Sequence, residues 1–176
     1  MIAILLEVGL FALLLFIDLF SKGMIIPFLE QVSGGFYPLI DGVLSLEQVP
    51  LNDGASFGFL SGQQGLLIAI SIIVILVLFV GLVLTDEKPR LLRYGVVTIM
   101  AGAMGNLVDR IAFNGVRDFI DYTFFHTWFD ASFAVGNIAD IFCLVGVLMI
   151  LIYLLFEYRE GDISWRHKRL LLWRKK

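Results

Sequence analysis

Four stretches of the chain are long and apolar enough to cross a bilayer, and this constrains the fold more than any other feature. A transmembrane helix needs about 20 mostly apolar residues, because the helix itself must satisfy its backbone hydrogen bonds where water is absent. The predicted spans are residues 2–20, 66–84, 91–112 and 133–156, and the second of them carries no charge. The sequence therefore predicts an all-α membrane protein with four transmembrane helices.

The composition leaves no room for a separate soluble domain. Of the 176 residues, 59% are hydrophobic and only 16% are charged, whereas soluble domains carry about 25% charged residues. We therefore expect one integral membrane domain over residues 1–176. The first apolar stretch lacks a basic start and an Ala-x-Ala site, so we interpret it as a retained span rather than a cleaved signal peptide.

Positive charge is distributed unevenly between the connections. Ten of the 13 Lys and Arg residues lie either around the 85–93 loop or in the segment 157–176. Because loops rich in Lys and Arg stay in the cytoplasm, both termini are predicted to be inside, and the 21–65 and 113–132 connections outside. The basic tail also contains Trp and Leu, which is typical of a segment on the inner membrane surface. We expect membrane lipid, and not nucleic acid, as its partner.

The long 23–64 connection is expected to have structure of its own. Residues 43–49 resemble a strand, and residues 55–60 are predicted to be its partner. Between them, Pro50 and Asn52-Asp53-Gly54 supply turn chemistry. We predict that this connection forms a small extracytoplasmic β-sheet and a short surface helix.

Two aspartates lie at one predicted depth of the membrane. Asp118 follows the third span and Asp140 lies inside the fourth. Since these spans run in opposite directions, both carboxylates are expected near the outer face. Insertion of an ionisable residue within a span costs about 2.5–3.5 kcal/mol of free energy. Such a residue is therefore first considered as part of a functional site. Two close carboxylates that share one proton suit the chemistry of an aspartic protease. Asp121 and Asp130 are rivals for Asp118 that spacing alone does not exclude.

Further polar residues share helix faces near these carboxylates. Asn106, Asp109 and Arg110 lie three or four residues apart in the third span, and Asn137 lies three residues before Asp140. Such side chains either support a site or simply pair with other groups and hold the helices together. We favour the second interpretation for Asp109 and Arg110, although an Arg beside a site also holds its geometry.

Other candidate groups point to no additional chemistry. Asp18 and Lys22 have the spacing of an ion pair at the outer end of the first span. His126 and His167 have no second ligand at a suitable spacing, so we expect no metal site. The single Cys143 is interpreted as a packing residue. The sequence contains neither a nucleophile elbow nor a phosphate-binding loop, and we expect no cofactor.

Four blocks of the sequence together resemble the lipoprotein signal peptidase family, signal peptidase II. Asp18 with Lys22 is similar to its Asp-Gln-x-x-Lys block, and residues 52–57 are similar to Asn-Thr-Gly-Ala-x-Phe. Residues 105–119 resemble Gly-Asn-x-x-Asp-Arg followed by Val-x-Asp-Phe, and residues 137–140 resemble the end of Phe-Asn-x-Ala-Asp. The chain departs from these blocks at three positions, which are Leu19, Asp53 and Gly136.

The resemblance implies an intramembrane aspartic endopeptidase with Asp118 and Asp140 as its catalytic pair, and so it favours Asp118 over Asp121. The implied substrates are bacterial prolipoproteins whose Cys carries diacylglycerol, cut just before that Cys. The implied setting is the bacterial inner membrane, with a monomeric enzyme and an active site near the outer face. The residues implied to bind substrate or support the site are Asn52, Gly54, Asn106, Asp109, Arg110, Asn137, Asp18 and Lys22.

Two other classes of protein are compatible with buried carboxylates. A small proton-coupled transporter would use Asp18, Asp109 and Asp140 as a relay. The four short spans without inverted repeats argue against that class. A non-enzymatic subunit would use the same polar residues only to pack helices.

Overall fold

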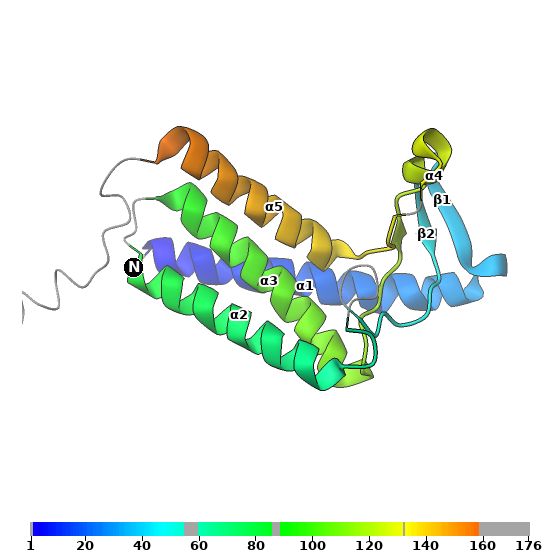
Figure 1. Ribbon diagram of the computed structural model, residues 1–176, viewed down its shortest axis with the longest axis horizontal. Coiled ribbons are helices and arrows are strands. Elements are labelled where there is room, and N and C mark those ends of the chain that lie inside the picture. Colours follow the sequence, from blue (N-terminus) through cyan, green and yellow to red (C-terminus); the bar gives the residue numbers. More distant parts are fainter. Residues whose placement is uncertain (1, 55–59, 86–88, 132, 159–176) are drawn as a thin grey trace, which may run out of the picture.

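In the computed structural model, four long helices form a bundle, and a small sheet with a short helix lies at one end of it (Figure 1). The structure describes residues 2–54, 60–85, 89–131 and 133–158, so most of the predicted basic tail lies outside the described residues. Each long helix has the length and composition to cross a membrane, which confirms the predicted fold class. These helices are α1 (Ile2–Gln31), α2 (Gln64–Leu84), α3 (Arg90–Phe113) and α5 (Ile138–Ile152), and a π-helical turn over Tyr153–Glu157 extends α5.

Two helix boundaries differ from the prediction. The first span was predicted to end at residue 20, but α1 continues through Pro27 to Gln31 and has 30 residues, a length of about 45 Å. The charges of Asp18 and Lys22 do not end the helix, because both side chains are buried and bonded inside the bundle. The fourth span begins at Ile138 rather than 133, because the residues before it are not helical and Asn137, in an extended conformation, caps α5.

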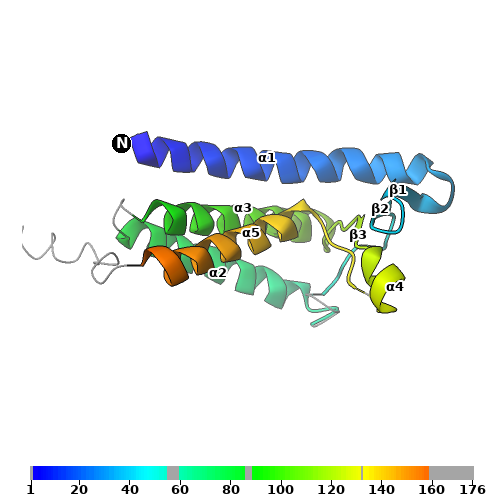
Figure 2. The same ribbon diagram turned by 90° about the horizontal axis from the view of Figure 1, so that it is seen from above.

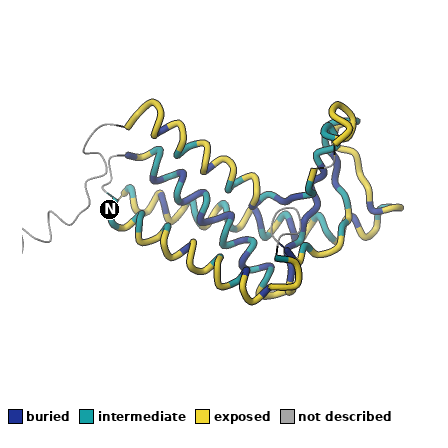
Figure 3. Tube along the Cα trace, viewed as in Figure 1, coloured by how far each residue is buried: buried dark blue, intermediate teal, exposed yellow. Residues whose placement is uncertain are grey.

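Helix α3 lies between the other long helices and packs against α1, α2 and α5 (Figure 2). Half of its most apolar window is buried, compared with 11% for α1 and for α2 (Figure 3). Glycines allow the closest approaches, because a Cβ at Gly102 would collide with the backbone of Ala139, and a Cβ at Gly105 with the carboxylate of Asp18. The polar residues of α3 can therefore face protein instead of lipid.

The small sheet contains the predicted strand but not its predicted partner. β2 (Leu44–Glu47) lies between β1 (Phe36–Ile40) and β3 (Ile120–Asp121), and both pairings are antiparallel. The prediction of 55–60 as the partner was wrong, because both edges of β2 are already occupied; residues 55–59 themselves lie outside the described part of the chain. The β1–β2 turn contains Gly42 with a φ of 69°, a left-handed conformation that glycine adopts without strain.

The short surface helix lies in the connection between α3 and α5. It is α4 (Phe124–Phe129), which follows β3, whereas it was expected between residues 23 and 64. In the described part of that earlier connection, the helical structure is the end of α1 and a 3-10 turn over Ser33–Gly35. The sheet end of the bundle is thus built from both connections, joined through the β2–β3 pairing.

Two further bridges hold the segment that follows α3. Asn52 pairs with Val116, and Ile120 pairs with Gly136, both in antiparallel fashion. These bridges tie the chain around Asp118 to the first outer connection on one side and to the start of α5 on the other. The sheet therefore fixes this segment against the ends of α3 and α5.

Candidate active site

Asp118 is a buried carboxylate held by two side-chain amides. Its side chain lies on the segment between α3 and β3, and the residue is only 4% exposed. One oxygen accepts a hydrogen bond from Nδ2 of Asn137 at 2.6 Å. The other accepts from Nδ2 of Asn52 at 2.9 Å. Both donors favour the charged form of the carboxylate and fix its orientation.

Asp140 occupies the third position of α5 and closes a capping box with Asn137. Its Oδ2 accepts from the backbone N–H of Asn137 at 2.9 Å, while the Asn137 side chain accepts from the backbone N–H of Asp140 at 3.2 Å. This reciprocal pattern satisfies free N–H groups at a helix start. The other oxygen of Asp140 accepts from Nδ2 of Asn106 at 2.9 Å, which connects it to α3.

The two carboxylates are connected through a pair of asparagines. Nδ2 of Asn137 donates to Asp118 and lies 3.1 Å from Oδ1 of Asn106, whose own Nδ2 donates to Asp140. Each carboxylate is therefore oriented by amides that also bond to each other. Asn106 is further fixed by the ammonium of Lys22, which donates to its Oδ1 at 2.9 Å.

Both carboxylates face one cavity of about 480 Å³ at the sheet end of the bundle. This volume lies within the range of about 300–1,000 Å³ that is common for small-molecule sites. Five residues predicted for the site line the cavity: Asn52, Asn106, Arg110, Asp118 and Asp140. The other predicted residues lie behind this lining: Gly54, Asp109, Asn137, Asp18 and Lys22. Apolar residues such as Phe133 and Leu144 complete the wall.

A buried ion network supports the lining from behind. Lys22 donates to Asp18 at 2.9 Å and lies 3.4 Å from a carboxylate oxygen of Asp109. The other oxygen of Asp18 accepts from the backbone N–H of Ala139 at the start of α5. Asp109 also accepts from the guanidinium of Arg117 at 2.6 Å. The predicted ion pair of Asp18 and Lys22 is therefore present, and it joins α1 to both α3 and α5.

Arg117 is a residue that the sequence reasoning missed. It was counted only as an isolated charge in an outer connection, yet its guanidinium and its backbone N–H both bond to Asp109. It directly precedes Asp118, so the same contact fixes the backbone of the candidate carboxylate. The sequence did contain a signal for this contact. Arg117 is a basic residue next to the candidate Asp118, and Asp109 in the preceding helix had no assigned partner.

Arg110 connects the outer connection to the cavity. Its guanidinium donates to the carbonyl of Gly54 at 3.2 Å, which holds the turn after Asn52 against α3. The backbone N–H of Gly54 in turn donates to Oδ1 of Asn52 at 3.0 Å. Nε of Arg110 is buried and donates to no acceptor among the described residues. Arg110 therefore leaves a cationic donor at the wall of the cavity.

The rival carboxylates have other partners. Asp121 accepts from the hydroxyls of Ser45 at 3.0 Å and Thr123 at 2.8 Å, within the sheet, and it does not line the cavity. Asp130 ends α4 in a left-handed conformation. Asp53, which replaces the Thr of the family pattern, accepts from Ser61 at 2.7 Å and so holds its own loop. Its charge does not line the cavity.

Burial raises the pKa values of two cavity residues that lie between α3 and α5. The pKa of Asp118 is raised to about 6, chiefly by burial and also by the nearby charge of Asp140, against the opposing effect of the hydrogen bonds from Asn52 and Asn137. Burial and the same two carboxylates raise the pKa of Tyr122, another cavity residue that the sequence reasoning missed. Asp118 therefore holds its proton to a higher pH than an exposed aspartate does.

Among the residues that the structure describes, no group of three or more His, Cys, Asp or Glu side chains could hold a metal ion. The polar side chains that line the cavity carry two carboxylates, a guanidinium, two amides, the Tyr122 hydroxyl and the Cys143 thiol. Such a set is suited to proton transfer and to binding of a peptide backbone.

The chain has four helices that can span a membrane, and two carboxylates face one cavity at one end of them. The fold and the site are therefore those of a multi-pass membrane protein with groups for acid–base chemistry. Residues 10–156 match the model of the Peptidase_A8 family, signal peptidase (SPase) II. The chain belongs to this family, which is a family of proteases. Membership does not favour the transporter or the non-enzymatic subunit considered above.

Individual relatives agree with the family assignment. The lipoprotein signal peptidase of Caldanaerobacter subterraneus subsp. tengcongensis is 34% identical over 146 residues, covering 83% of this chain and 93% of that protein. The lipoprotein signal peptidase of Clostridioides difficile is 36% identical, covering 82% and 90% of the two chains. A solved bacterial membrane enzyme superposes with a TM-score of 0.73 at 27% identity, covering 90% of this chain and 94% of that one.

Proposed function

We propose that this protein is an aspartic endopeptidase of the bacterial cytoplasmic membrane that removes the signal peptide from prolipoproteins. The observation that carries the proposal is the pair Asp118 and Asp140 at one cavity, each oriented by amides that bond to each other. Family membership supports the class of substrate. The apolar wall of the cavity suits a substrate that remains in the bilayer.

The proposed hydrolysis needs no covalent intermediate. One proton is shared by the pair, and burial favours its location on Asp118. Asp140, which is exposed at the cavity, takes a proton from water as the water oxygen attacks the scissile carbonyl. Asp118 donates its proton to the carbonyl oxygen, which gives a neutral diol. As the diol collapses and the C–N bond breaks, one diol hydroxyl returns its proton to Asp118 and Asp140 gives its proton to the leaving amine, which restores the starting protonation of the pair.

The supporting residues hold the two carboxylates in position and do not themselves exchange protons with the substrate. Asn106 and Asn137 hold the carboxylates in one geometry through the reaction. Asn52 holds Asp118 and, through Gly54 and Arg110, places the first outer connection against the cavity. Preorganised donors of this kind cost no reorganisation when charge moves.

The proposed substrate is a prolipoprotein whose Cys carries diacylglycerol, cleaved just before that Cys. Each buried CH₂ of an acyl chain contributes about 0.8 kcal/mol to membrane binding, so the lipid would keep the scissile bond near the bilayer surface. Asp140 lies in the first turn of α5, and Asp118 follows the end of α3. The ends of spanning helices lie near a membrane surface, which supports this presentation. The charge distribution supports a topology with both termini inside and this end outside.

Cleavage of a defined precursor tests the proposal. Purified protein in detergent is incubated with a precursor peptide in a lipidated and an unlipidated form, and the products are identified by mass spectrometry. We expect one cut, just before the lipidated Cys, and little cleavage of the unlipidated peptide. Equal cleavage of both forms would reject the lipid requirement, and no cleavage of either would reject the proposed activity.

A further inference from the structure

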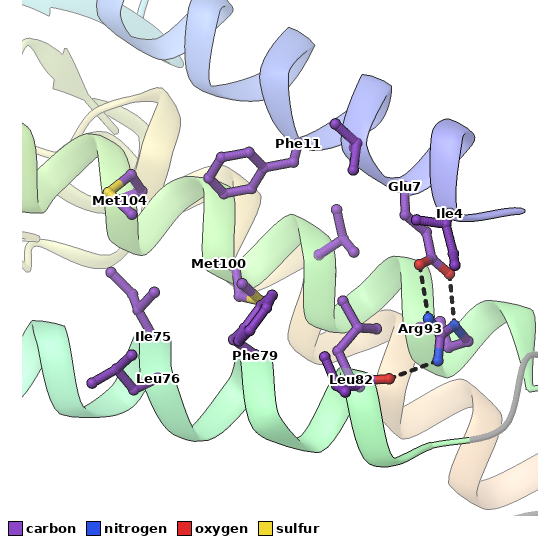
Figure 4. Close-up of a pocket in the computed structure, with 13 residues that line it drawn as sticks. Ile4, Glu7, Phe11, Ile75, Leu76, Phe79, Leu82, Arg93, Met100 and Met104 are labelled. Carbon is purple, nitrogen blue, oxygen red and sulfur yellow. Dashed lines mark hydrogen bonds and ion pairs between the residues drawn. The ribbon is translucent and has the colours of Figure 1, made fainter. Parts of the chain in front are cut away.

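A second cavity of about 570 Å³ lies between α1, α2 and α3, in the half of the bundle remote from the candidate active site (Figure 4). α1 and α2 both pack against α3 rather than against each other, which leaves a groove over one face of α3. Val97 and Met100 of α3 are buried at its floor, whereas Val8 of α1 and Leu76 of α2 are exposed at its rim. The groove shares no lining residue with the active-site cavity.

The lining of this cavity is apolar except at one end. There Arg93 donates to both oxygens of Glu7, at 2.6 and 2.8 Å, and to the carbonyl of Leu82 at 2.7 Å (Figure 4). This ion pair lies near the starts of α1 and α3 and the end of α2, hence at the level where the helices leave the bilayer. The cavity therefore has a polar end at the membrane surface and an apolar shaft that points toward the bilayer centre.

The dimensions of the shaft match one leaflet. Arg93 and Met104, the lining residues of α3 that lie furthest apart, are separated by 11 positions, which corresponds to about 16 Å along a helix. Half of a hydrocarbon core of about 30 Å is about 15 Å. The length of the cavity therefore corresponds to the depth of the acyl chains in one leaflet.

Water is excluded as the occupant by the chemistry of the wall. A buried water needs two to four polar partners, and an apolar cavity stays dry and takes up apolar molecules instead. An empty groove in a bilayer would also deprive its lining atoms of dispersion contacts. Met100 and Met104 supply flexible side chains that adapt to the shape of an apolar ligand.

We propose that this cavity binds one acyl chain of a bilayer phospholipid, from the leaflet opposite the active site. The chain lies along α3 with its glycerol end at the Glu7–Arg93 pair and its methyl end at Met104. The site is independent of the proposed peptidase activity, because it faces another side of α3 and the opposite membrane half.

Photo-crosslinking in nanodiscs tests this assignment. The probe is phosphatidylglycerol with a diazirine near the end of one acyl chain, doped into nanodiscs of unlabelled phosphatidylglycerol. We expect adducts at Phe11, Met100 and Met104, at a higher yield than at the outward residues Ile73 and Val77 of α2. Equal yields at both places, or no adduct at the three lining residues, would overturn the proposal.

Two substitutions sharpen the result. Val97→Phe adds a larger side chain at the floor of the cavity. Val8→Trp narrows the rim of the cavity, and it should not disturb the fold because Val8 is exposed. Each CH₂ that is no longer buried weakens binding about fourfold, so exclusion of two should lower adduct yield at Met100 about 15-fold. Val77→Phe, on an exposed position outside the cavity, should leave the yield unchanged. Loss of the adducts on addition of lipidated precursor would instead make the cavity a substrate site and overturn the assignment.

Discussion

Nδ2 of Asn137 lies 2.6 Å from Oδ1 of Asp118, and this hydrogen bond connects the start of α5 to the segment that follows α3. The same asparagine donates its backbone N–H to Asp140. One residue therefore orients both candidate carboxylates, although it touches no substrate in the proposed mechanism. Its buried amide replaces the water that would otherwise solvate Asp118.

Asn137→Ala is expected to lower kcat much more than it changes KM, because it leaves the carboxylates in place but without their common donor. A hydrogen bond to a charged group contributes about 1.5–3 kcal/mol, so the loss should be about 10- to 150-fold. Asn114→Gly is the matched control, since it removes an exposed amide from a left-handed position. Steady-state kinetics on the lipidated precursor measure kcat and KM separately. A rise in KM with no change in kcat would assign Asn137 to substrate binding.

The raised pKa of Asp118 predicts a pH-dependent stability. Burial raises this pKa to about 6, whereas an unfolded aspartate titrates near about 3.9. Between these values the folded state holds more protons than the unfolded state, so stability falls as pH rises, by up to about 3 kcal/mol. Asp118→Asn removes the titrating carboxyl, so this pH dependence of stability is absent from the variant. The new amide can fit poorly against the amides of Asn52 and Asn137, but that effect on stability does not change with pH.

Thermal unfolding in detergent checks this sign. The Tm of the wild type should fall relative to that of Asp118→Asn as pH rises from about 4 to about 6.5, and the difference should then remain level. A wild-type Tm that rises relative to the variant over this range would mean that the hydrogen bonds, and not burial, dominate the pKa of Asp118.

Lys22→Met is expected to destabilise the fold strongly. It removes the cation that contacts both Asp18 and Asp109, and leaves two buried carboxylates without it. Breaking a buried ion pair in this way costs about 3–5 kcal/mol. Glu30→Gln, an exposed change two turns further along α1, serves as the control. A Tm equal to that of the control would show that water or a proton compensates for the lost cation.

Membrane topology is predicted from the distribution of Lys and Arg. Reporter fusions after Asp86 and at Lys176 should be cytoplasmic, and a fusion near Ser45 should be external. Alkaline phosphatase and green fluorescent protein reporters distinguish the two sides. A cytoplasmic fusion near Ser45 would place the carboxylate cavity on the wrong face of the membrane.

The sequence was sufficient for the number of spans, because apolar length is a local property. It was insufficient for the end of α1, because hydropathy treats Asp18 and Lys22 as exposed charges. Their partners Asn106, Asp109 and Ala139 are more than 80 residues away in the chain. A charge that is neutralised by distant residues does not end a helix.

The sheet shows the same limit. The turn residues Asn52 and Asp53 predicted a local hairpin, yet their side chains bond to Asp118 and Ser61. The true partner of β2 on the site side is Ile120–Asp121, in the other outer connection. For the candidate site, spacing placed Asp118 and Asp140 at one depth, and only the resemblance chose between Asp118 and Asp121.

We propose that Asp118 and Asp140 together carry out the hydrolysis. The most direct test is single-turnover cleavage of the lipidated precursor by Asp118→Asn, Asp140→Asn and Asp121→Asn, each verified as folded by its Tm. Asn is nearly isosteric but cannot exchange the shared proton, so the first two variants should release no detectable signal peptide. Asp121→Asn should retain cleavage, because its carboxylate bonds to Ser45 and Thr123 away from the cavity. Substantial cleavage by either Asp118→Asn or Asp140→Asn would contradict the account.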